Sequence, residues 1–168
     1  FVREGFETVE HALSGAVDIL VEAMSEDSNL RSWTFNEIWN YSLVVSSLKN
    51  EEKDDSKTFQ MYYDFSEKIS KIQGYRILAL NRGEKLGVLK VAFEHNSDKM
   101  LRFFGARFKE KNKYIEDVIS QSVKKKIVPA MERRIRAELT EIAEDGAISL
   151  FSENLRSLLL VSPLKGKV

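Results

Sequence analysis

Apolar side chains recur every three or four residues along most of the chain. The first such run, between residues 7 and 24, consists of Val9, Leu13, Ala16, Val17, Leu20 and Met24. A longer run after Asn112 consists of Ile115, Val118, Ile119, Val123, Ile127, Met131, Ile135, Leu139 and Ile142. The period resumes after Gly146 with Ile148, Phe151, Leu155, Leu158 and Leu159. Because this spacing places the apolar side chains on one face of a helix, the pattern predicts long amphipathic helices that each bury one face.

Capping and breaking residues divide these predicted helices. The polar residues 25–28 are expected to form a turn, and Thr34 with Glu37 matches a capping box, which predicts a helix start at Thr34. Pro129 interrupts the longest apolar run. Because a proline inside a helix removes a backbone hydrogen bond and clashes with the preceding turn, we expect a kink or a break between Lys126 and Pro129.

Two short stretches depart from the helical period. Residues 88–94 alternate apolar and polar side chains, which is typical of a half-exposed strand. Residues 43–48 are rich in β-branched side chains but too short for the pattern to distinguish strand from helix. A single strand would leave its backbone groups unpaired, so the partner of 88–94 is either 43–48 or a strand of a longer parent protein. Between these stretches a helix is expected from Gly74 to Lys85, with Gly87 in a left-handed conformation after its end.

These patterns predict a mainly α fold: an elongated multi-helix array with a long kinked C-terminal helix and at most a small two-stranded β element. We expect an N-terminal helical part at residues 1–50 and a region with a charged loop and a short strand at residues 51–96. A long helical scaffold at residues 97–162 and a linker at residues 163–168 complete the expected organisation. The charge run at residues 50–57 is expected to be an exposed loop.

Composition narrows the classes of function. The 168 residues include 26 Lys and Arg, 26 Asp and Glu, and no cysteine. The balanced charge provides no global attraction to nucleic acid or to an anionic membrane, and the lack of cysteine excludes thiolate chemistry in this chain. No apolar run approaches the roughly 20 residues that a membrane-spanning helix requires. We therefore expect a cytoplasmic protein without membrane contact.

The sequence offers little catalytic chemistry. Its two histidines, His11 and His95, lie far apart and outside any metal-binding spacing, and no P-loop or nucleophile-elbow motif is present. Paired acids such as Glu51 and Glu52 are expected to belong to the solvated loop and not to a magnesium site. We therefore expect no enzymatic activity, with no catalytic residue, metal site, cofactor or small-molecule substrate.

One basic stretch departs from the balanced charge. Residues 109–136 contain nine cations against four acids, and the cations are Lys109, Lys111, Lys113, Lys124, Lys125, Lys126, Arg133, Arg134 and Arg136. One interpretation is a cationic ridge that contacts phosphates; the other is an ordinary solvated helix face whose charges pair with the acids of residues 138–145. A smaller candidate set consists of Arg76, Arg82 and Lys85, which helix ends and ion pairs to Glu84 or Asp64 would explain equally well.

Two segments carry a more specific pattern. The first consists of residues 62–67 followed by residues 74–85, with Arg82-Gly83-Glu84 near its end, and the second runs from Ala147 to Leu160. Both resemble signatures of the Tex family of bacterial transcription accessory proteins, and the resemblance covers nearly the whole chain. One departure is Tyr75, where the family usually has a histidine before the arginine. This departure argues against a proton-transfer role at that position.

The resemblance implies a position within a larger protein. In Tex-like proteins this region leads into an RNase-H-like (YqgF) domain, followed by helix-hairpin-helix elements and an OB-type RNA-binding domain. The chain, which begins at Phe1 without a methionine, would then be the central helical scaffold of a factor related to a eukaryotic transcription elongation factor. The resemblance implies that it supports RNA or DNA binding and transcription regulation by the parent protein, with RNA polymerase as a further candidate partner. The alternative is a helical protein–protein adaptor that makes no nucleic-acid contact of its own.

Overall fold

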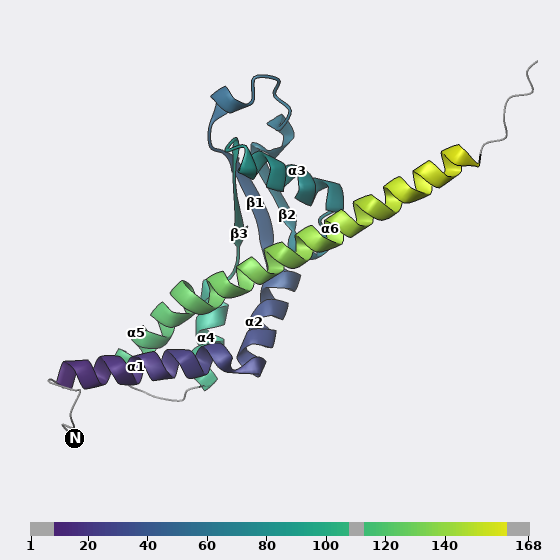
Figure 1. Ribbon diagram of the computed structural model, residues 1–168. Helices are drawn as coiled ribbons and strands as arrows, with labels where there is room; N and C mark the ends of the chain where they lie inside the picture. Colours follow the sequence, from purple (N-terminus) through teal and green to yellow (C-terminus); the bar gives the residue numbers. More distant parts are fainter. Residues whose placement is uncertain (1–8, 108–112, 161–168) are drawn as a thin grey trace, which may run out of the picture. The chain divides into compact units, whose positions relative to one another are not determined.

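The computed structural model describes residues 9–107 and 113–160, and these parts are mainly α-helical (Figure 1). The helices are α1 (Val9–Glu26), α2 (Ser28–Tyr41), α3 (Gly74–Lys85), α4 (Ser97–Arg107), α5 (Lys113–Ser122) and α6 (Val128–Leu159). The strands are β1 (Leu43–Leu48), β2 (Asp64–Lys68) and β3 (Leu89–Glu94). A π-helical segment, η4 (Val123–Ile127), lies between α5 and α6. The predicted mainly α fold class with a long C-terminal helix is confirmed.

The chain forms two compact units that alternate along the sequence. Unit 1 comprises residues 1–43, 68–70 and 93–135, and unit 2 comprises residues 44–67, 71–92 and 136–168. Unit 1 therefore contains α1, α2, α4, α5, η4 and the beginning of α6, while unit 2 contains α3, nearly all of the sheet and the remainder of α6. The linker predicted at residues 163–168 lies outside the described part of the chain.

The helices of unit 1 pack through their apolar faces. Its buried apolar side chains are Val21, Met24, Leu30, Ile38, Ile69, Met100, Phe104, Ile119, Val123, Ile127, Val128, Met131 and Ile135. The chain turns between α1 and α2 at Asp27, whose carboxylate accepts hydrogen bonds from the amides of Asn29 at 2.8 Å and Leu30 at 3.2 Å. This cap satisfies amide groups that have no partner within the helix, so the turn predicted at residues 25–28 is confirmed.

The helix start predicted at Thr34 is wrong. Thr34 lies buried within α2, where its hydroxyl donates a hydrogen bond to the carbonyl of Leu30 at 2.7 Å. Glu37 is also buried, and its carboxylate lies 2.7 Å from the ammonium group of Lys99 in α4. Both side chains of the apparent capping box therefore have other partners, one within α2 and one in α4.

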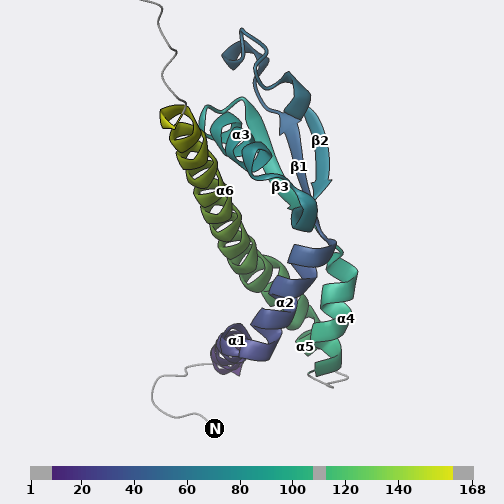
Figure 2. The same ribbon diagram turned by 90° about the vertical axis from the view of Figure 1, so that its right-hand side faces the viewer.

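The sheet has three strands in the order β2-β1-β3, one strand more than predicted (Figure 2). The amide of Leu48 donates to the carbonyl of Tyr63 at 3.1 Å, so the end of β1 lies beside the start of β2 and these strands are antiparallel. The amide of Lys49 donates to the carbonyl of Val88 at 2.7 Å, which sets the same relation between β1 and β3. Residues 43–48 are thus a strand, and they pair with the predicted strand at 88–94.

The charged loop after β1 holds one buried acid. Asp54 accepts hydrogen bonds from the amides of Thr58 and Phe59 and from the hydroxyl of Tyr63, each at 2.8 Å. Desolvation raises the pKa of the Asp54 carboxyl, but the three hydrogen bonds together outweigh it and hold that pKa below its ordinary value of 3.8. Burial and the bond to Asp54 raise the pKa of Tyr63 to about 12. The loop is otherwise exposed from residue 51 to residue 57, as predicted.

Helix α3 packs closely against the sheet at Gly83. A Cβ atom added at this glycine would lie 2.6 Å from Cδ1 of Leu89 in β3 and 3.1 Å from Cδ1 of Phe59. The absence of a side chain therefore permits the packing of α3 on β3. The glycine after the helix, Gly87, has a φ of 75°, which confirms the predicted left-handed conformation.

Helix α6 buries every fourth residue along its first half. Ile127, at the end of η4, is followed by Met131, Ile135, Leu139 and Ala143, all buried. Because a four-residue step exceeds the helical repeat of 3.6 residues, this buried stripe winds around the helix axis. The stripe therefore reaches Ala143 instead of the predicted Ile142, whose side chain is 54% exposed.

Pro129 is accommodated without a break in the helical path. It is preceded by η4, in which the amide of Val128 donates to the carbonyl of Val123, five residues earlier. A proline ring clashes with the carbonyl four residues before it in a regular α-helix. The wider π turn relieves this clash, because it shifts the carbonyl groups that precede the proline. The predicted irregularity lies at the expected place, and its form is a π turn.

The last turns of α6 are not covered by any described part of the chain. All residues from 144 to 160 are exposed. The apolar side chains predicted to resume a buried face after Gly146 are therefore exposed instead, by 62% at Ile148 and by 76% at Leu159. The residues continue the helix as predicted, but the prediction that they bury one face within this chain is wrong.

Replacing Gly83 by alanine is expected to lower the free energy of unfolding by roughly 1–3 kcal/mol, because the added methyl group overlaps Leu89. The control is Gly146→Ala in α6, where an added Cβ atom has no neighbour within 4 Å. That variant should gain about 1 kcal/mol from helix propensity. Urea denaturation of both variants checks the prediction, and equal stability gains in the two would contradict it.

Replacing Asp54 by asparagine is expected to lower the melting temperature at pH 7. A carboxyl group with a depressed pKa contributes stability that is present above its unfolded-state pKa and is lost as the pH falls through its folded-state pKa. The melting temperatures of D54N and the unsubstituted chain should therefore converge as the pH falls below 3.8. Calorimetry between pH 7 and pH 2.5 measures this, and a difference that stays constant with pH would refute the role of the charge.

Candidate nucleic-acid interface

The basic residues of the predicted ridge belong to both units. Unit 1 contains Lys124, Lys125, Lys126, Arg133 and Arg134, whereas Arg136 belongs to unit 2 together with Arg76, Arg82 and Lys85. Lys109 and Lys111 lie outside the described residues. Lys113 is the first residue of α5, but its side chain is not described. Within the described structure the ridge is therefore a set of five cations on η4 and the first turns of α6.

The three consecutive lysines form the π turn before Pro129. Lys124, Lys125 and Lys126 are all exposed, and none of them has an ion pair among the residues that the structure describes. Lys125 and Lys126 line a groove of about 180 Å³ between α1 and α5, whose only described acid is Asp18. The π turn thus presents a local excess of positive charge to solvent.

Arg134 combines this positive charge with aromatic surface. Its guanidinium carbon lies 4.8 Å from the centre of the Phe35 ring in α2, a distance at which a cation is attracted by the ring face. The Phe35 ring in turn stacks on Trp39, with ring centres 5.6 Å apart and planes 16° from parallel. Both rings are half-buried, and Arg134 is exposed.

Phe35 and Trp39 are not among the site residues predicted from the sequence. Arg31, Phe35 and Trp39 follow one another at intervals of four residues, so they lie along one side of α2. The only acid of α2 is Glu37, which is buried beside Lys99. A sequence signal for this surface was available: one side of the helix has an arginine and two aromatic residues and no carboxylate. Aromatic residues in an amphipathic pattern are usually assigned to the hydrophobic core, so their role in a binding surface is easily missed.

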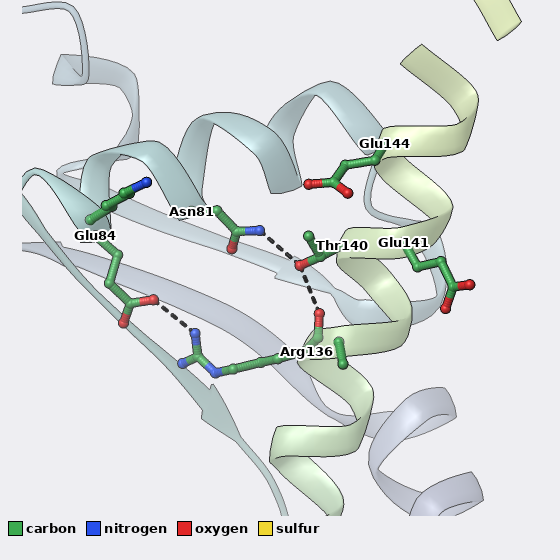
Figure 3. A pocket seen from close by; sticks show the side chains of 8 residues that line it. Asn81, Glu84, Arg136, Thr140, Glu141 and Glu144 are labelled. Carbon is green, nitrogen blue, oxygen red and sulfur yellow. Dashed lines mark hydrogen bonds and ion pairs between the residues drawn. The ribbon is translucent and has the colours of Figure 1, made fainter. Parts of the chain in front are cut away.

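Arg136 is engaged within unit 2. Its guanidinium donates to the carboxylate of Glu84 in α3 at 3.0 Å (Figure 3). It also donates to the carbonyl of Val91 in β3 at 2.7 Å. These bonds join α6 to α3 and to the edge of the sheet. The bonded guanidinium has a structural role, which weakens the interpretation of Arg136 as a phosphate ligand.

Arg136 and Lys85 also line a cleft of about 530 Å³ between α3 and α6. Figure 3 shows Asn81 donating to the hydroxyl of Thr140 across this cleft, at 2.9 Å. The cleft carries three carboxylates, Glu84, Glu141 and Glu144, against two cations. This balance disfavours an anionic ligand in the cleft that Lys85 lines.

Arg76 is held by the signature segment that surrounds it. Its guanidinium donates to the carboxylate of Glu67 at 2.6 Å and to the hydroxyl of Tyr75 at 3.1 Å. The hydrogen bond to Glu67 and then the one to Tyr75 raise the pKa of Arg76. Its guanidinium carbon also lies 5.8 Å from the centre of the Phe65 ring. Arg82 is exposed and has no ion pair within the described ranges.

Little in the described residues resembles a reaction centre. His95 lies 3.4 Å from the carboxylate of Glu132, and His11 lies in α1 without a described side-chain environment. Among the described residues no three His, Cys, Asp or Glu side chains are placed to hold a metal ion together. In the same residues no helix has the length and apolar character to cross a membrane.

The chain matches known proteins along nearly its whole length. Residues 1–151 match the family model described as Tex central region-like. The chain is 39% identical over 166 residues to the protein YdcI of Bacillus subtilis, a match that covers 95% of this chain and 23% of that protein. It is 27% identical over 173 residues to the transcriptional accessory protein Tex of Neisseria gonorrhoeae, covering 97% of this chain and 23% of that protein.

A human protein is also similar. The S1 RNA-binding domain-containing protein 1 of Homo sapiens is 32% identical over 182 residues, covering 98% of this chain and 18% of that protein. The chain therefore spans about a fifth of the length of these curated relatives. The family model covers all of unit 1, the Tyr62–Lys85 signature and unit 2 as far as residue 151. On these grounds the chain belongs to the Tex family and corresponds to its central region.

Proposed function

We propose that this chain is a helical scaffold segment of a Tex-type transcription accessory protein, which supports nucleic-acid binding and transcription regulation by the parent protein and catalyses no reaction itself. The names of two relatives support the parent's role, since one is a transcriptional accessory protein and another contains an S1 RNA-binding domain. RNA polymerase is a further candidate partner of the parent protein. The structural support comes from the end of α6.

The observation that carries the scaffold proposal is an apolar stripe on α6. It consists of Ile148, Phe151, Leu155, Leu158 and Leu159, whose exposed fractions range from 44% to 76%. Their spacing of three and four residues places them on one face of the helix, and Glu153 and Ser157 lie on the opposite face. Each such side chain gains roughly 1.5–3 kcal/mol when it is fully buried. A contiguous stripe of this kind is typical of a contact surface.

The size of the stripe favours another part of the parent polypeptide as its partner. A stable interface between separate proteins buries about 800 Å² per partner and involves roughly 20–30 residues on each side. Five large side chains on a single helix fall short of that. A segment of the same polypeptide has an effective concentration of the order of millimolar, so a small contact suffices to hold it. The helix would then position the parent's nucleic-acid-binding parts.

The alternative function is a helical adaptor for a separate protein. The same apolar stripe supports it, because an amphipathic helix face can also bind in a groove of another molecule. The two functions differ in what unit 1 does. A scaffold with the exposed lysines of η4 should bind nucleic acid weakly, whereas an adaptor for proteins alone should not bind it.

Replacing Leu155 and Leu158 by glutamine should destabilise the attachment of α6 in the longer parent protein. In the 168-residue chain the change should alter the free energy of unfolding by no more than about 0.5 kcal/mol, since both side chains are exposed. In the parent protein the amides of residues 144–160 should exchange with deuterium faster than in the unsubstituted parent. Hydrogen–deuterium exchange of chain and parent measures both effects.

The matched control replaces Leu150 and Leu160 by glutamine, because these leucines are also exposed but lie off the stripe. It should leave exchange in the parent unchanged. If residues 144–160 exchange equally fast in the unsubstituted chain and parent, the stripe is not covered and the scaffold proposal fails.

The chain should bind labelled single-stranded RNA weakly, with an affinity that falls steeply as salt increases. Replacing Lys124, Lys125 and Lys126 by glutamate should reduce this affinity at least tenfold, because phosphate contacts release counterions and reversed charges repel the backbone. Fluorescence anisotropy over a salt series measures both the affinity and its salt dependence.

The control replaces three exposed lysines of unit 2, Lys49, Lys71 and Lys90, by glutamate, which changes the net charge equally. An equal loss of affinity in the two triple variants would show that overall charge determines binding and would contradict a specific role of η4. No binding at any salt concentration would favour the protein-only adaptor.

A further inference from the structure

We propose that the side of α2 formed by Arg31, Phe35 and Trp39, together with Arg134 of α6, binds single-stranded nucleic acid by stacking bases on its aromatic rings. We call this surface the α2 flank. The inference rests on the proposed function, since it requires a parent protein that binds nucleic acid. In this proposal the bases of the nucleic acid contact the aromatic residues of α2 and not the lysines of η4.

The α2 flank presents ring surface beside fixed positive charge. The rings of Phe35 and Trp39 are nearly parallel, and the Arg134 guanidinium lies over Phe35 at 4.8 Å. Because Phe35 and Trp39 are only half-buried, part of their surface is accessible to a ligand. An unpaired base stacks on such a ring whatever its identity, and a guanidinium beside it can meet the adjoining phosphate.

The charges along α2 suit an anionic ligand. Its exposed residues other than Tyr41 are Ser28, Asn29, Arg31, Ser32, Asn36 and Asn40, and none of them carries a negative charge. Arg31 lies one turn before Phe35, so it adds a second cation to the flank. The amide of Asn40 donates to the carbonyl of Asn36 at 2.8 Å, which leaves its side-chain oxygen available to accept from a base edge.

The second tryptophan of α2 provides a contrast within the same unit. Trp33 stacks on Phe103 of α4 with ring centres 3.7 Å apart and planes 8° from parallel. This close stack occupies one face of each ring. Trp33 and Trp39 are the only tryptophans of the chain. Each can therefore be made the sole fluorophore by one conservative substitution of the other.

The geometry favours single strands over duplexes. Bases in a duplex are stacked on one another and paired, so their faces are not available to a protein ring. A groove that binds single strands by stacking commonly holds about 4–16 nucleotides. Oligouridine of about 12 nucleotides is therefore a suitable probe.

The test uses the whole 168-residue chain as Trp33→Phe, in which Trp39 alone emits, and as Trp39→Phe, in which Trp33 alone emits. Oligouridine should quench the emission of Trp39 in W33F and leave the emission of Trp33 in W39F unchanged. An abasic oligonucleotide of the same length keeps the phosphates but has no bases. It should bind at least about tenfold more weakly and should not quench Trp39.

A second pair of variants tests the stack without removing a tryptophan. Phe35→Leu keeps the apolar volume but removes the ring face, and Arg134→Gln removes the charge. Each should weaken oligouridine binding by about tenfold while the thermal melting curve keeps its cooperative form. Phe103→Leu, on the side of Trp33, is the matched control and should leave the affinity unchanged.

Two results would overturn the α2 flank as a binding site: equal affinity for oligouridine and the abasic strand, or equal quenching of both tryptophans. In either case the reversal of Lys124, Lys125 and Lys126 would still report on the proposed function. If that triple variant binds normally while Trp39 is quenched, the α2 flank stands and the role of η4 fails. If the chain binds no oligonucleotide, the α2 flank fails, and the exchange experiment on α6 still tests the scaffold.

Discussion

The structure depends on the four-residue spacing of buried side chains along η4 and α6. Ile127, Met131 and Ile135 complete the core of unit 1, and Leu139 and Ala143 continue the same spacing in unit 2. One helix therefore supplies apolar side chains to both units. The burial of each large side chain stabilises the fold by roughly 1.5–3 kcal/mol. A polar substitution in this stripe would therefore destabilise the core of the unit in which it lies. The π turn before Pro129 preserves the helical path at the point where a regular helix would meet a steric clash.

The residues that identify the family have structural roles that can be stated individually. Tyr63 holds the buried Asp54, and Gly83 permits the contact of α3 with Leu89 of β3. Glu84 binds Arg136, and this ion pair connects α3 to α6. These residues stabilise unit 2, so a sequence signature that contains them indicates the fold of that unit. The signature is therefore strong support for family membership and weak support for any particular ligand, since Tyr63, Arg76 and Glu84 are already bonded within the protein.

Sequence patterns predicted the elements that local chemistry specifies. The alternation at residues 88–94 and the glycine at position 87 were sufficient for a strand and a left-handed turn. Strand β2 was missed because its five residues include only one large apolar side chain, Phe65, among polar ones. The capping box failed because Thr34 and Glu37 have other partners, the latter in α4. Periodicity identifies an apolar helix face but not what covers it, which explains why the end of α6 was predicted to be buried.

Part of the candidate interface could be predicted from neighbouring residues in the sequence, and part depends on tertiary contacts. The basic triplet at residues 124–126 is visible in the sequence, whereas the contact between Arg134 and Phe35 joins residues about a hundred positions apart. Charge alone would act over a short range here, because the chain is neutral overall and salt screens exposed charges beyond about 8–10 Å. A neutral protein that binds a polyanion therefore needs contacts that do not depend on long-range attraction. Base stacking on half-exposed rings is such a contact, because its strength comes from surface burial and persists at physiological salt.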